Sequence, residues 1–126
     1  MKAYVQTAFG EVELHLYHRR ERALRLARRL GASVTFAESA HAQTNGFDSG
    51  YNIVCFVLLE AEVRDADQLA SLMAHEAVHV SQIILDHFGE DEPGEETRAY
   101  LVQNVTYALL DMHRRWASGH PIAHPS

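Results

Sequence analysis

A chain of 126 residues with 47% hydrophobic residues and a formal net charge of −6 has the size and composition of one folded domain. The apolar content excludes an intrinsically disordered protein, and the acidic balance argues against a nucleic-acid-binding protein. No repeat, low-complexity tract or linker divides the chain.

The cysteine content and the N-terminal sequence indicate in which cellular compartment the protein is expected. Cys55 has no partner for an intramolecular disulfide, and its apolar neighbours indicate a buried thiol. The first residues lack the apolar core of a signal peptide, and no stretch approaches the length of a membrane span. We therefore expect a cytoplasmic protein that does not interact with membranes.

The first thirty residues predict a hairpin and a helix. Ala3–Phe9 and Val12–Tyr17 are partly alternating runs on either side of a glycine, which is typical of two strands and a turn. Arg20–Leu30 has apolar residues at helical spacing and is followed by Gly31, a common residue at a helix end. In an alternative assignment, the residues from Glu11 onward join this helix.

Two more strands are expected before residue 60. Ala32–Glu38 is predicted to be a strand, and the polar composition of His41–Gly50 predicts a loop. Tyr51–Leu59 is an apolar run with the length and β-branched content of a fully buried strand.

Two long helices are predicted to follow. Asp65 or Asp67 can cap the first helix, which should end near Phe88. Apolar residues at helical spacing then form the buried stripe of this helix, namely Leu69, Met73, Ala77, Val80 and Ile84. The second helix should begin near Glu95 and end near Trp116.

This order of elements predicts an α+β fold, with a small mixed sheet followed by two long packed helices. We assign residues 1–116 to a single domain and Ala117–Ser126 to a loose C-terminal tail. His15 and His18 are expected on a strand surface, and His113 is expected with His120 and His124 in a mobile tail that could bind metal adventitiously.

An HExxH motif, His75-Glu76-Ala77-Val78-His79, lies inside the first long helix. Residues four apart lie on one helix face, so the two imidazoles can converge on one zinc ion. Glu76 points about a quarter-turn away, where its carboxylate can reach a water on that metal and act as a general base. The motif therefore predicts a zinc-dependent hydrolase.

A catalytic zinc ion usually has three protein ligands, so a third ligand is expected. Glu95 and Glu96 begin the next helix, and an antiparallel helix pair would bring one of them back towards the motif. We prefer Glu96 because it shares a polar face with Tyr100, which could orient a ligand or donate to an oxyanion. Glu95 stays an alternative, and either glutamate could instead be a solvated carboxylate favoured by the helix dipole.

The motif and the pattern Glu96-x-x-Ala99-Tyr100 resemble the gluzincin arrangement of zinc peptidases. The stretch from Leu69 to Leu110 is similar to short zincin-like proteins of phages and bacteria. Many gluzincins have an aspartate at the position of Tyr100, so the residue that orients the histidines is unassigned.

The resemblance implies that His75, His79 and Glu96 bind zinc and that Glu76 is the catalytic base. It also implies a peptide or protein substrate, bound in extended form along an edge strand that we assign to Tyr51–Leu59.

Two other functions fit the residues. The first is a zincin-like binding or structural module, of phage origin, that holds metal without turnover. The second is a metal-free interaction domain in which the arginines of the Arg20–Leu30 helix contact an acidic partner. A solvated helix face is the simpler explanation of these arginines. No sequence feature sets an oligomeric state.

Overall fold

Four strands and three helices make up the part of the chain that the computed structural model describes, residues 1–32, 42–48, 53–60, 63 and 65–119. The strands are β1 (Lys2–Thr7), β2 (Gly10–Tyr17), β3 (Ala42–Asp48) and β4 (Ile53–Leu59). The helices are α1 (Arg20–Arg29), α2 (Ala66–His87) and α3 (Glu95–Gly119). The predicted α+β fold, with a small mixed sheet and two long packed helices, is confirmed.

The strands form one sheet in the order β1-β2-β4-β3. β1 and β2 pair as an antiparallel hairpin, β2 and β4 pair in parallel, and β3 pairs antiparallel with β4. All seven residues of β4 are buried. An interior strand covered on both faces needs apolar side chains on both faces, which explains the uninterrupted run Ile53–Leu59.

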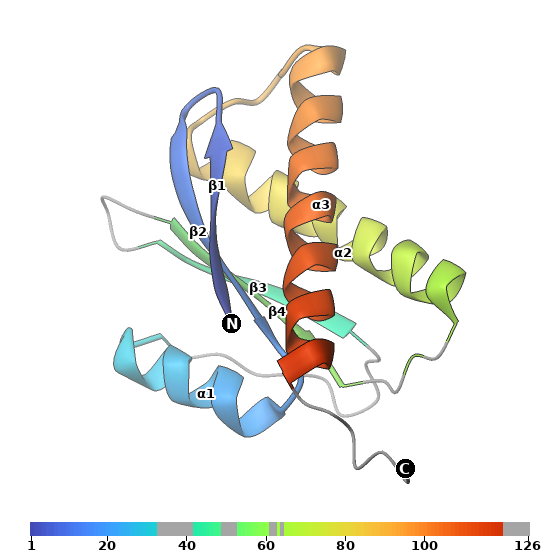
Figure 1. Cartoon of the computed structure of the whole chain (residues 1–126). Helices are drawn as coiled ribbons and strands as arrows, with labels where there is room; N and C mark the ends of the chain where they lie inside the picture. Colours follow the sequence, from blue (N-terminus) through green and yellow to red (C-terminus); the bar gives the residue numbers. More distant parts are fainter. Residues whose placement is uncertain (33–41, 49–52, 61–62, 64, 120–126) are drawn as a thin grey trace, which may run out of the picture.

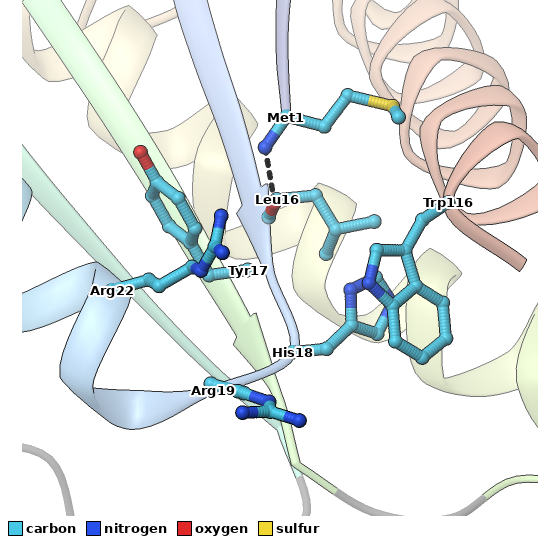
Figure 2. Close-up of a pocket in the computed structure, with 7 residues that line it drawn as sticks. All are labelled: Met1, Leu16, Tyr17, His18, Arg19, Arg22 and Trp116. Atoms are coloured by element: carbon cyan, nitrogen blue, oxygen red, sulfur yellow. Dashed lines mark hydrogen bonds between the residues drawn. The ribbon is translucent and has the colours of Figure 1, made fainter. Parts of the chain in front are cut away.

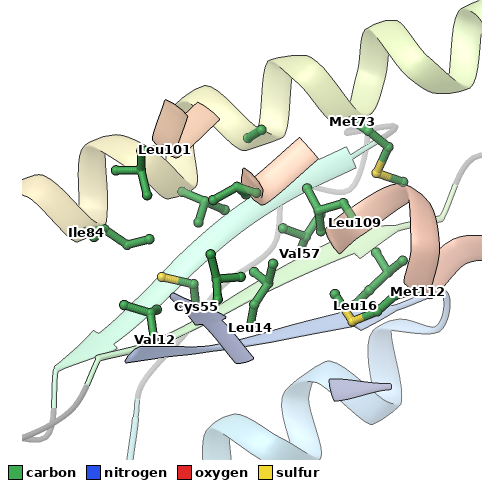
Figure 3. Close-up of a cluster of buried hydrophobic side chains, with 14 of the residues drawn as sticks. Val12, Leu14, Leu16, Cys55, Val57, Met73, Ile84, Leu101, Leu109 and Met112 are labelled. Carbon is green, nitrogen blue, oxygen red and sulfur yellow. The ribbon is translucent and has the colours of Figure 1, made fainter. Parts of the chain in front are cut away.

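The helices cover both faces of this sheet. α2 and α3 lie on one face, and α1 lies on the other (Figure 1). Successive β4 side chains alternate between the two layers: Cys55 and Val57 pack in the cluster with α2 and α3, whereas Val54 and Phe56 pack with Leu26 and Ala27 of α1. The larger cluster forms the main core between the sheet and the two long helices (Figure 3).

The helix ends follow local sequence signals. Asp65 accepts a hydrogen bond from the backbone N–H of Asp67 at 2.8 Å and so caps α2. Gly31 and Gly89, just after α1 and α2, have φ values of 74° and 72°, which favour glycine. These boundaries are confirmed. The end predicted near Trp116 is wrong, because α3 continues to Gly119.

The largest difference between the predicted and observed elements is strand β3. Residues 42–48 were expected in a loop, but Ala42–Asp48 is a strand at the edge of the sheet. Its sequence AQTNGFD lacks the apolar alternation of a typical strand because the edge is only half-buried and faces a helix closely. A Cβ atom on Gly46 would lie 2.6 Å from Ile83 Cγ2, so glycine permits this approach of β3 to α2.

Two further expectations concern neighbouring segments. The predicted strand Ala32–Glu38 falls almost wholly outside the described residues. The alternative in which the residues from Glu11 onward join a helix is wrong, because they continue the strand Gly10–Tyr17.

Within the described residues, no helix is both long enough and apolar enough to cross a membrane.

Candidate metal-binding site on helix α2

His75 and His79 come together on the exposed side of α2. Their Nε2 atoms are 3.2 Å apart, and their ring centroids are 4.9 Å apart. Two nitrogens bound to one tetrahedral zinc at about 2.0–2.1 Å would be separated by roughly 3.3 Å. The two imidazoles therefore already have the nitrogen spacing that a shared metal ion requires.

The apolar stripe of α2 determines which way these histidines point. Met73, Ala77, Val80 and Ile84 have no measurable exposure and face the core, as predicted. His75 and His79 lie on the other side of the helix, next to Val78, whose side chain is 55% exposed. Burial of the stripe thus places the two histidines at the surface.

Glu76 has a different environment from the two histidines that flank it. It is only 4% exposed, and its Oε2 accepts a hydrogen bond from the Thr44 hydroxyl of β3. The carboxylate therefore joins the middle of α2 to the edge strand. A buried carboxylate requires such a donor, because an unpaired charge in the interior is strongly unfavourable.

Glu96 and Tyr100 lie elsewhere on the molecule. Both line a cavity of about 290 Å³ next to Phe9, at the turn between β1 and β2. Tyr100 is 59% exposed. In Figure 1, α3 crosses α2 and its first turn lies over the β1–β2 end of the sheet, so the helix does not run back alongside α2.

The structure consequently does not bring the predicted third ligand to the histidine pair. Glu95 contributes to a separate surface with Pro93 and Ala99. Among the residues that the structure describes, no group of three or more His, Cys, Asp and Glu side chains is placed to hold a metal ion. The two-histidine part of a zinc site fits the structure, whereas the ligand set with Glu96 does not form.

Other histidines have environments that the sequence did not reveal. His15 was expected on a strand surface but is buried, with 7% exposure, and its Nε2 lies 2.9 Å from Glu13. Burial lowers the pKa of His15, and the hydrogen bond to Glu13 opposes that shift. His87 lies 2.7 Å from Asp48 at the end of β3 and does not join the pair on α2.

His18 and His113 also form a pair that the sequence analysis missed. His18 Nε2 lies 2.9 Å from His113 Nδ1, and the His18 ring stacks on Trp116 with centroids 3.5 Å apart. His113 therefore lies in α3 and packs against His18 and Trp116, and is not part of a loose tail. Since the two histidines are 95 residues apart, no local sequence pattern signals this contact.

Comparison with protein-family models, curated proteins and solved structures finds no match for this chain. The geometry of the α2 site therefore carries the functional proposal.

Proposed function

We propose that the protein is a zinc-dependent hydrolase that acts on a peptide or another amide, with His75 and His79 as metal ligands and Glu76 as the general base. The observation that carries this proposal is the 3.2 Å separation of the two Nε2 atoms. Both rings are exposed, so substrate can approach the metal position without a rearrangement of the core.

Zinc would supply an electrophile that polarises the scissile carbonyl and acidifies water. Glu76 would take a proton from the attacking water on a carboxylate oxygen and return it to the departing amine. For this role the Glu76 carboxylate has to exchange its hydrogen bond to Thr44 for one to water. The link to Thr44 sets the orientation from which the carboxylate starts.

A peptide substrate would bind beside β3. The prediction that the strand in Tyr51–Leu59 lies at the edge of the sheet is wrong, because β4 lies between β2 and β3. β3 is the edge strand that contacts α2, and Thr44 and Gly46 face the helix that carries the motif. An extended peptide that pairs with the outer edge of β3 would run near His75 and His79.

Zinc content per chain tests the metal ligands. We expect about one zinc per wild-type chain after reconstitution, and at least about tenfold weaker binding for His75→Ala and for His79→Ala. His87→Ala is the matched control, because His87 is on the same helix but contacts Asp48 instead of the pair. Wild-type protein that holds no zinc, or a His87→Ala variant that loses as much zinc as the others, would contradict the site.

The role of Glu96 can be tested in the same assay. Glu96 lies beside Phe9 and Tyr100, so Glu96→Ala should retain zinc with less than about threefold loss of affinity. A loss equal to that of His79→Ala would show that the first turn of α3 moves to the motif when metal binds, as the sequence resemblance implies.

Glu76→Gln separates catalysis from metal binding. Gln keeps the size of the side chain and an oxygen that can accept from Thr44, but it cannot take a proton as a base. Turnover on a panel of peptide substrates should fall by at least about a hundredfold while zinc content stays the same. Full activity in this variant would refute Glu76 as the base.

A second candidate, a metal-holding binding or structural module without turnover, is favoured by the burial of Glu76. In this candidate the Glu76 carboxylate, 4% exposed and bonded to Thr44, attaches α2 to β3 and takes no part in catalysis. This candidate predicts that zinc raises the melting temperature of the wild-type protein while no substrate is cleaved. Zinc-dependent cleavage that Glu76→Gln abolishes would exclude it.

A further inference from the structure

A cavity of about 400 Å³ opens where the end of β2, the start of α1 and the last turns of α3 meet. Figure 2 shows its lining, which includes Tyr17, His18, Arg19, Arg22 and Trp116. The volume falls within the range of small-molecule sites, roughly 300–1,000 Å³. None of these residues belongs to the histidine pair on α2.

The charges at this cavity are positive. Arg19 and Arg22 both line it, and no lining residue is acidic. Arg20, between them, is paired with Glu60 at 2.7 Å, whereas neither Arg19 nor Arg22 has an ion-pair partner among the described residues. The Met1 amine donates to the Leu16 carbonyl at 3.0 Å in the same cavity. Burial lowers the pKa of this amine most, and the positive charge of Arg22 lowers it further.

The start of α1 adds to this field. Its N-cap residue is Arg19, which makes no side-chain capping hydrogen bond. A helix N-terminus carries a partial positive charge, so arginines there are unfavourable unless an anion offsets them. Glu21 is the acidic residue in the first turn, and it does not line the cavity.

One wall of the cavity is aromatic and well fixed. The rings of His18 and Trp116 are stacked with 10° between their planes, and His18 also contacts His113. Tyr17 also lines the cavity, but its side chain extends to the other side of β2 and packs with the α1 cluster (Figure 2). Stacked rings that are held on both sides offer a rigid surface against which a planar group can pack at little entropic cost.

We infer that this cavity binds a small anion that carries a planar group, such as an aryl phosphate or an aryl carboxylate. Arg19 and Arg22 bind the anionic oxygens, for which the guanidinium fork is well suited. The planar group packs against the wall formed by His18 and Trp116. This site is separate from the proposed hydrolase centre and does not depend on it.

The fluorescence of Trp116 provides a direct assay, because the chain contains one tryptophan. Phenyl phosphate, benzoate, inorganic phosphate and phenol are titrated into the full-length protein at constant ionic strength, and calorimetry with the same compounds gives a second readout. We expect saturable binding of phenyl phosphate or benzoate, at least about tenfold tighter than that of inorganic phosphate or phenol. The tighter of the two anions identifies the phosphate or carboxylate class.

Arginine variants locate the ligand. Arg22→Gln and Arg19→Gln should each weaken binding about tenfold, the effect of one lost charge-assisted hydrogen bond. Arg25→Gln is the matched control, because Arg25 is exposed on the same helix but does not line the cavity, and it should change binding less than about twofold. Unchanged denaturation midpoints will show that the variants are folded.

Three outcomes would overturn the inference. The first is the lack of saturable binding of both aryl anions. The second is equal binding of inorganic phosphate and phenyl phosphate, which would remove any role for the aromatic wall. The third is equal weakening by Arg25→Gln and Arg22→Gln, together with salt-sensitive binding of a single-stranded oligonucleotide, which would make the whole arginine helix a diffuse polyanion surface.

Discussion

Replacement of Thr44 by Val tests whether the bond to Glu76 fixes α2 on the sheet edge. Val has nearly the same shape as Thr but cannot donate a hydrogen bond, so the buried Glu76 carboxylate loses its Thr44 donor. A hydrogen bond to a charged group contributes about 1.5–3 kcal/mol. We expect the free energy of unfolding to fall by about that amount, and the melting temperature to fall by about 6 °C or more.

Urea denaturation at pH 7 provides the measurement, with Thr44→Ser as the control that keeps the hydroxyl. Thr44→Ser should cost less than about 1 kcal/mol, since it removes only a methyl group. In a Glu76→Ala background, Thr44→Val should cost less than about 0.5 kcal/mol, because the two effects are coupled. If Thr44→Val is as stable as wild type, the bond does not hold α2 to β3.

Three further predictions concern the core and the sheet. Gly46→Ala should cost about 1–3 kcal/mol in chemical denaturation, because the new Cβ would lie 2.6 Å from Ile83 Cγ2, and in an Ile83→Ala background the same change should cost less than about 0.5 kcal/mol. Burial raises the pKa of the Cys55 thiol to about 12, so a thiol reagent at pH 8 should label it only at the rate of unfolding, and rapid native labelling would contradict its burial. The pKa of His15 is lowered on folding, so its contribution to stability is complete above the unfolded value near 6.5 and decreases as the pH falls through the lower folded value. Stability measured from pH 7.5 to 5.5 should therefore fall less steeply in His15→Gln than in wild type.

The elements that the sequence predicted correctly depend on local patterns. The apolar stripe of α2 and the cap at Asp65 are contained within a few turns of one helix, so spacing alone sets the helix and the side on which His75 and His79 lie. The sequence also predicts the strand Ile53–Leu59. A strand that is buried on both faces has apolar residues at every position, and few other elements show such a run.

The features that the sequence did not predict depend on how distant segments pack. The position of Glu96 is set by the way α3 crosses α2, and nothing within the α3 sequence encodes that crossing. The polar sequence of β3 predicts a loop because its residues contact a helix: Thr44 donates to Glu76, and Gly46 makes room for Ile83. The contact between His18 and His113 joins the end of β2 to the last turns of α3.

The parallel pairing at the centre of the sheet has a consequence for how the chain folds. Glu13 lies opposite Val54 and Leu16 lies opposite Val57, so the middle of the sheet forms only after a loop of about forty residues closes. The β1–β2 hairpin and the α2–α3 pair can each form from neighbouring segments, but the core between the sheet and both helices is complete only when β4 docks. We therefore expect the docking of β4 against β2 to limit the folding rate, and substitutions at this pair to slow refolding more than they speed unfolding.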